Sequence, residues 1–297
     1  MLTVTNIKVH TFDLDWLDVY WEIEDTYEDV DAYDIYVLKS EAEEGPYHIV
    51  AGPFENKFHF RDTTARLKRR YRNWWYRIRL VNKADQTTKE FPDVSGATMR
   101  ARPDFEGLEM ARQEQMKLGE FNGRRVVILP TKTFGQKCKC WDPNTDQVVH
   151  APCVTCFGTR YVGGYHTPII VPARIVTAPE STNSTRLLEA KQQLSMVHLA
   201  DFPLIKTGWL IIEPGENLRW RVGENITVVQ KLRFTVRQMA PIASVPIGDV
   251  SYKIPVNIDD PQNFEPSPPR QFSRPSAMTS IGDEVYIGAM GAFIDNG

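Results

Sequence analysis

Apolar and polar side chains alternate in several short runs over the first hundred residues. The alternation is strict at Leu17, Val19 and Trp21, and it recurs over Tyr33–Val37 and Trp74–Leu80. A period of two sends successive side chains to opposite faces of a strand, so one face of each run is expected to be buried. Each run therefore predicts a β-strand.

Two shorter runs, Val4–Val9 and Phe58–Phe60, show a similar pattern. Turn-forming residues separate the runs, as at Glu44–Pro46 and Gly52–Pro53,. Short strands joined by turns favour two antiparallel sheets packed face to face. We therefore expect residues 1–101 to form an antiparallel β-sandwich.

The pattern changes after Pro103. Asp104 is a favourable N-cap for a helix that continues to about Gly119,. The apolar residues expected on one side of this helix are Phe105, Leu108, Ala111 and Leu118. A short strand is predicted at Arg125–Pro130, so residues 102–130 are expected to connect the sandwich to the next segment.

The second half of the chain again predicts strands. They fall at Pro168–Val176, Gly208–Ile212, Leu218–Val222, Ile226–Val229 and Leu232–Arg237. The polar residues 180–192 predict a loop or a weak helix. Several strands in so short a stretch favour a small β-barrel or a strongly bent sheet over residues 169–257. The Pro-rich residues 258–297 predict an extended arm, so the fold class expected for the chain is mainly β,.

The composition is that of a globular protein. Of 297 residues, 42% are hydrophobic and 25% are charged, and the net charge is −3. These values argue against a disordered chain, and so small a net charge provides no general attraction to nucleic acid or to anionic membranes. No run of about 18 apolar residues occurs, so no membrane span is predicted. The segment Met1–His10 lacks the basic start and apolar run of a secretion signal, which favours a cytoplasmic site of folding,.

Charge is unevenly distributed within the expected sandwich. Residues 11–44 hold thirteen acidic side chains and one lysine, whereas residues 61–79 hold eight basic side chains and one aspartate. Two solvated faces would account for this distribution. A second interpretation is that the acidic face of one copy meets the basic face of the next, a head-to-tail contact that builds rings.

The cysteines carry the clearest chemical signal. All four lie in one short segment with the spacing C-x-C-x12-C-x2-C, at Cys138, Cys140, Cys153 and Cys156. Two close pairs on either side of a loop can bring four thiolates to the corners of a tetrahedron. We therefore predict a structural Zn2+ site within a zinc knuckle over residues 131–168. Because four ligands already complete such a site, catalysis by this metal is not expected.

Other arrangements of these cysteines stay open. The four could form two disulfides or remain buried thiols, although a C-x-C pair bridges only with strain and disulfides are uncommon in a reducing cytoplasm. His150 or His166 could replace one cysteine as a ligand, since each flanks the cluster. With four thiolates available, the all-cysteine set is favoured.

No catalytic motif is found. The sequence lacks H-E-x-x-H, G-x-S-x-G and phosphate-loop patterns, and its six histidines are scattered,. We therefore expect no catalytic residues, no cofactor other than the metal, and no enzymatic activity.

The N-terminal strands resemble those of a fibronectin type III domain. The likeness rests on Leu17–Trp21, on Ala32–Leu38 with the following Gly45–Tyr47, and on Tyr76–Asn82. In that family a conserved tyrosine is expected where this chain has Trp74. The resemblance implies a fibronectin type III-like sandwich over about a third of the chain.

The cysteine segment resembles a motif in structural proteins of tailed bacteriophages. The similar stretches are Phe134–Pro143, Cys153–Thr159 and Gly163–Tyr165, with Arg160 where that motif has glycine. Three later stretches resemble the C-terminal β-region of the same proteins, and also the small barrels of phage neck proteins: Asp201–Trp209, Arg219–Val222 and Gly248–Pro255.

These resemblances imply a structural component of a tailed-phage virion. The expected place is the neck, as a head-to-tail connector or head-closure ring of six or twelve copies. It would bind the portal, an adaptor or the tail terminator, with the sandwich directed outward and assembly in the bacterial host cytoplasm. Neither membrane binding nor specific nucleic-acid recognition is expected.

Three other interpretations give the chain a different place in the virion or a different class of function. A baseplate or tail protein would share the same motifs. A nucleic-acid-binding zinc ribbon would use the interleaved basic and aromatic side chains of Arg69–Arg79, although the knuckles themselves hold few basic residues,. An extracellular carbohydrate-active enzyme with a fibronectin module would require an acid pair, and none is evident.

Overall fold

The computed structural model describes most of the chain. The described residues are 2–12, 16–65, 73–99, 104–142, 147–148, 153–177, 194–214, 216–232 and 234–254. All of them lie in one compact unit, Met1–Glu265. The expected arm over 258–297 and the expected loop over 180–192 fall outside the described residues. The domain boundaries expected from the sequence stay a prediction.

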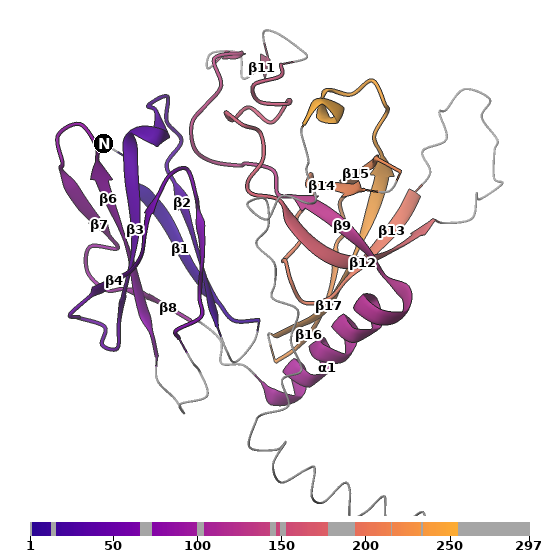
Figure 1. Cartoon of the computed structure of the whole chain (residues 1–297), viewed down its shortest axis with the longest axis horizontal. Helices are drawn as coiled ribbons and strands as arrows, with labels where there is room; N and C mark the ends of the chain where they lie inside the picture. Colours follow the sequence, from indigo (N-terminus) through magenta and orange to yellow (C-terminus); the bar gives the residue numbers. More distant parts are fainter. Residues whose placement is uncertain are drawn as a thin grey trace, which may run out of the picture. The chain divides into compact units, whose positions relative to one another are not determined.

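Two antiparallel sheets form the N-terminal region (Figure 1). The sheet with the order β1-β2-β5 consists of β1 (Val4–His10), β2 (Leu17–Ile23) and β5 (His59–Asp62). The other has the order β4-β3-β6-β7, with β8 also paired to β6, and consists of β3 (Tyr33–Ser40), β4 (His48–Phe54), β6 (Trp75–Asn82), β7 (Thr88–Phe91) and β8 (Ala97–Thr98). A 3₁₀ turn, η1 (Val30–Ala32), leads into β3.

The alternating apolar side chains of both sheets fill one core. Trp21 of β2, Ile35 of β3 and Ile78 of β6 are 1%, 0% and 0% exposed, and all three belong to a single buried cluster. Their burial follows from the period of two that the sequence displays. The strands predicted around these residues are therefore confirmed, and their two sheets share one buried core.

One expected turn is part of a strand. Gly52–Pro53 lies within β4 rather than between strands. The pairing of β4 with β3 shifts register beside Val37, and Gly52 has a φ of +121°, a backbone conformation that glycine adopts without strain,. The proline is tolerated because β4 is at the sheet edge and pairs only with β3,. The glycine and proline that suggested a turn therefore lie in an edge strand with a bulge.

The connecting helix begins where the sequence predicts. In α1 (Phe105–Met116) the Asp104 side chain accepts a hydrogen bond from the Gly107 N–H, and the chain continues as a π-helical turn, η2 (Lys117–Asn122). Leu108, Ala111 and Leu118 are buried as expected. The expectation for Phe105 is wrong, because its side chain is 74% exposed at the start of the helix.

The C-terminal strands close into a six-stranded antiparallel barrel (Figure 1). The order β13-β12-β9-β14-β15-β17 becomes a ring because β17 also pairs with β13, from Leu194↔Ala243 to Leu199↔Gln238. β16 pairs with β17 outside the ring. These strands are β9 (Arg124–Leu129), β12 (Ile169–Thr177), β13 (Leu194–Leu199), β14 (Leu210–Glu213), β15 (Leu218–Val222), β16 (Thr227–Lys231) and β17 (Phe234–Ser244).

The barrel confirms one of the two alternatives that the sequence left open, a barrel rather than a bent sheet. Ring closure depends on β13, which the sequence analysis did not predict. β9 is apolar on both faces because Val126 and Ile128 point into the barrel core, whereas Val127 and Leu129 belong to a second buried cluster. Tyr165 and Tyr252 pack against that second cluster, and Tyr252 lies in the 3₁₀ turn η3 (Val250–Lys253). No helix in the described part of the chain is long and apolar enough to cross a membrane.

Candidate metal centre

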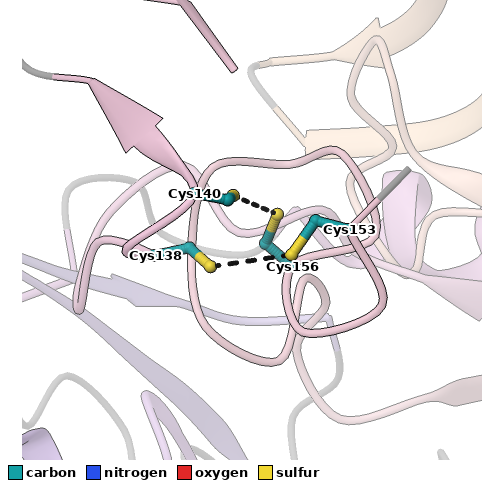
Figure 2. Close-up of side chains that lie close together, drawn as sticks. All are labelled: Cys138, Cys140, Cys153 and Cys156. Atoms are coloured by element: carbon teal, nitrogen blue, oxygen red, sulfur yellow. Dashed lines mark hydrogen bonds between the residues drawn. The ribbon is translucent and has the colours of Figure 1, made fainter. Parts of the chain in front are cut away.

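Four cysteine side chains converge between two loop segments (Figure 2). The Sγ atoms of Cys138 and Cys153 are 3.9 Å apart, and those of Cys140 and Cys156 are 3.3 Å apart. All four Sγ atoms lie within 4.8 Å of one another. Sulfurs at the corners of a tetrahedron about 2.3 Å from a zinc ion would be about 3.8 Å apart. The cluster therefore has the size and the donor set of a four-thiolate metal site.

Tight turns of the backbone position the thiols. The Trp141 N–H donates to the Cys138 carbonyl (3.1 Å), and the Phe157 N–H donates to the Cys153 carbonyl (2.9 Å), so each pair of cysteines spans one turn. The Cys138 N–H donates to the Arg160 carbonyl (2.7 Å), which fastens one turn to the other. The short strands β10 (Trp141–Asp142) and β11 (Gln147–Val148) pair in the loop between them.

Residues after the second pair adopt left-handed conformations. Gly164 has a φ of +70°, and a Cβ there would lie 2.8 Å from the Cys156 carbonyl oxygen, so this position requires glycine,. Arg160 also has a positive φ, +79°. Glycine would adopt this conformation without strain, whereas arginine rarely does. In this chain the Arg160 guanidinium lies 4.0 Å from the centre of the Trp141 ring, a cation–π contact across the knuckle,.

The thiols experience opposing electrostatic effects. Burial raises the pKa values of Cys138 and Cys140. Hydrogen bonds from the backbone N–H of Cys156, and also of Thr155, lower the pKa of Cys153 to about 6. A metal ion binds thiolates, so it would supply the positive charge that a group of buried thiolates needs. Four thiolate donors would fill the tetrahedral shell of such an ion and leave no coordination position for a substrate.

The structure bears on the alternatives to an all-cysteine metal site. All four cysteines are free, without a disulfide. His166, which the sequence left open as an alternative ligand, is not part of the group of side chains that could hold a metal ion. Its ring instead contacts the rings of Phe58 and Phe134, with centroid distances of 5.8 and 5.1 Å, and burial lowers its pKa to about 3. His150 lies outside the described residues.

The knuckle is joined to the N-terminal sandwich by its backbone, which the sequence did not indicate. The Lys137 N–H donates to the Thr26 carbonyl (2.8 Å), and the Thr26 N–H donates to the Gly135 carbonyl (3.1 Å). The Phe134 ring meets Phe58 edge to face at 5.0 Å. Two successive backbone bonds and one ring contact therefore fix the segment that leads into Cys138.

The charged faces expected on the sandwich are partly neutralised within it. Arg61 donates to the buried carboxylate of Asp18 (2.8 and 3.1 Å), and Arg79 donates to Glu90 (2.7 Å). Residues 66–72, which hold much of the basic run, lie outside the described residues. The described arginines of that run therefore contribute less free charge than the sequence suggested.

No protein-family model matches this chain, and no curated protein matches it. The features that bear on function are therefore the cysteine cluster, the N-terminal sandwich and the barrel, whose strands β9 and β12 flank the cluster in the sequence.

Proposed function

We propose that this chain is a structural component of a tailed-bacteriophage virion, a neck or head-to-tail connector ring protein that carries a structural zinc ion. The observation that carries the proposal is the four-thiolate cluster. It lies within residues 134–165, the stretch that resembles a motif of phage structural proteins, and it falls between β9 and β12, two neighbouring strands of a closed six-stranded barrel.

Zinc is the metal that the donor set favours. Four thiolates at tetrahedral spacing suit Zn2+ or an iron–sulfur centre, and a single ion fits sulfurs that all lie within 4.8 Å,. Such an ion would hold together a segment with a small apolar core of its own, because the free energy of metal binding is part of the free energy of folding.

The two β-regions support a role in assembly. The sandwich has the strand orders β1-β2-β5 and β4-β3-β6-β7, which agree with a fibronectin type III-like domain,. The closed six-stranded barrel supports the neck resemblance, which implies a small β-barrel in this part of the chain. In this proposal the barrel packs around the channel, the sandwich is directed outward, and copies join in a ring of six or twelve. A baseplate or tail position uses the same parts and stays the alternative placement.

The first experiment measures assembly. The purified chain is analysed by native mass spectrometry, alone and mixed with the portal, adaptor and tail-terminator proteins encoded by the same phage genome. We expect a ring of six or twelve copies, or a complex that forms only with one of these proteins. Imaging of particles in which this chain is labelled then separates the neck from the baseplate.

Two outcomes would contradict the proposal. One is a strict monomer that binds none of the three proteins and is missing from purified particles. The other is salt-dependent binding of the wild-type chain to duplex DNA without virion assembly, which would favour a nucleic-acid-binding zinc ribbon. Cys153→Ser, which removes one thiolate, serves as the matched variant that tests whether assembly depends on the metal centre.

A further inference from the structure

A hollow of about 260 Å³ lies beside the C-terminal end of α1, where the helix and η2 meet the outside of the barrel. Its residues come from the helix end and from β12, β13 and β17. None of the residues that line the hollow belongs to the cysteine cluster, so a ligand site there is independent of the function proposed above.

The walls of the hollow are held in place by buried contacts. Leu118 of η2 and Leu199 of β13 are 5% and 2% exposed and line its apolar part. The Gln115 side-chain amide donates to the Asp201 carboxylate (2.6 Å), which fastens the helix end to the barrel. Gln238, also in the lining, accepts from the Ile205 N–H (2.9 Å) and donates to the Pro203 carbonyl (2.8 Å). The side-chain amide of Gln238 is therefore held by hydrogen bonds within the protein, and Gln238 forms part of the wall of the hollow.

The charges around the hollow do not cancel. Lys117 and Glu114 form an ion pair at 2.9 Å and offset each other. The side chains of Arg174 in β12 and Arg237 in β17 are exposed, and neither makes a hydrogen bond or an ion pair with the residues that the structure describes. His198 of β13 lies directly across from Arg174 in the β12–β13 pairing. Two uncompensated guanidinium groups thus border a hollow with an apolar floor.

This combination suits a carboxylate on a short apolar stem. A guanidinium presents parallel N–H donors that match the two oxygens of a carboxylate, and Leu118 and Leu199 can contact the methylene groups behind it,. Glu114 also lines the hollow and adds a negative group there. A singly charged carboxylate meets less repulsion there than a doubly charged phosphate.

We propose that this hollow, bordered by Arg174, His198 and Arg237, is a docking site for a glutamate or aspartate side chain of an acidic peptide segment on a partner protein. The two guanidinium groups bind the carboxylate, and His198 adds a hydrogen bond. Because the described part of the chain gives these two guanidinium groups no hydrogen-bond or ion-pair partner, both are available to such a segment.

The test uses a fluorescently labelled hexaglutamate peptide and fluorescence anisotropy with the full chain at low salt. We expect saturable binding that weakens about tenfold or more in Arg174→Ala/Arg237→Ala, because each guanidinium contributes a charged hydrogen bond. The matched control is Arg125→Ala/Arg221→Ala, which removes two exposed arginines of β9 and β15 that do not line the hollow. This control is expected to bind within about twofold of wild type, since it loses only long-range attraction.

A second readout comes from His198. Burial, and then the positive charges of Arg174 and Arg237, lower the pKa of His198, whereas Glu114 opposes this effect. A bound carboxylate offsets the two arginines, so the pKa of His198 should rise when hexaglutamate is added, as followed by NMR of the imidazole protons. If Arg174→Ala/Arg237→Ala folds poorly, Arg174→Lys/Arg237→Lys keeps the charge, lacks the guanidinium fork and should still bind more weakly.

Three results would overturn the proposal. The first is no binding by the wild-type chain at low salt. The second is an equal loss of hexaglutamate affinity in both double variants, which would mean that the peptide binds by general electrostatic attraction rather than at the hollow. The third is that tripolyphosphate or a DNA oligonucleotide displaces hexaglutamate at much lower concentration than free hexaglutamate does, which would assign the hollow to phosphate. None of these results bears on metal content or on ring assembly.

Discussion

The carboxylate of Asp62 shows how a single buried residue organises the sandwich. Asp62 is 1% exposed, and it accepts hydrogen bonds from the Lys39 ammonium (2.8 Å), the Thr64 hydroxyl (2.6 Å) and the Tyr76 phenol (2.7 Å). Burial alone would raise the pKa of Asp62, but these hydrogen bonds together lower it below its ordinary value. Asp62, at the end of β5, therefore links β3 through its ion pair with Lys39 and β6 through its hydrogen bond from Tyr76.

The first prediction concerns this pair. Asp62→Asn leaves the Lys39 ammonium buried without its counter-charge, so the free energy of unfolding at pH 7 is expected to fall by about 3–5 kcal/mol. Because the folded pKa of Asp62 is lowered, its stabilisation is present above the unfolded value of about 3.9 and is lost as the pH falls through the folded pKa. The difference between wild type and variant should therefore shrink below about pH 4.

Urea unfolding curves at several pH values measure this effect. The control is Glu55→Gln, which breaks the exposed Lys83–Glu55 pair and is expected to change stability little,. An Asp62→Asn protein as stable as wild type at pH 7 would contradict the prediction.

Among the secondary-structure elements, α1 shows most clearly how a nearby residue, the N-cap Asp104, fixes where a helix begins. The Asp104 carboxylate accepts from the Gly107 N–H (3.3 Å), which satisfies one of the free donors at the helix start,. Gly107 also packs against Phe234 of β17, because a Cβ at this position would lie 3.3 Å from the Phe234 ring. The cap therefore sits where the helix docks on the barrel.

Asp104→Ala is expected to lower the free energy of unfolding by about 1 kcal/mol, since the first-turn N–H group loses its acceptor. Thermal melting followed by circular dichroism measures the loss. Asp104→Asn keeps a capping oxygen and should retain most of the stability. Equal melting of the alanine variant and wild type would show that the cap contributes nothing to the fold.

For the whole molecule, the metal centre is expected to control stability beyond its own loops. The knuckle contacts the sandwich through Thr26 and Phe58, and Tyr165, which follows the last cysteine turn, packs on the barrel strands β9 and β14. Loss of the ion would therefore loosen a segment to which both β-regions are attached.

Cys153→Ser, or treatment of the wild-type chain with a strong chelator, is expected to lower the melting temperature by about 10 °C or more, because the binding energy of the metal is folding energy. Elemental analysis should find one zinc ion per wild-type chain and a clear loss in the variant. His166→Gln is the control, since that side chain packs on aromatic rings and should leave the zinc content unchanged. Pure, folded protein without zinc and with a melt unaffected by chelator would contradict the metal assignment.

Much of this molecule was accessible from local patterns in the sequence. Period-two alternation places Trp21, Ile35 and Ile78 in a core because the two faces of a strand are fixed by covalent geometry,. The four cysteines lie within nineteen positions, 138 to 156, so a single short loop can bring them together, and their candidate role as ligands is also read from a local pattern. The same holds for the Asp104 cap, which depends on the next few residues alone.

What depends on residues far apart in the chain was decided only by the tertiary structure. β13 closes the barrel through partners some forty residues away, and the Asp62 pair joins three strands. The hollow takes its guanidinium groups from β12 and β17, which no spacing rule connects. Each of these features depends on which distant surfaces are buried together, and that choice is made by the free energy of the whole packed chain rather than by any local segment.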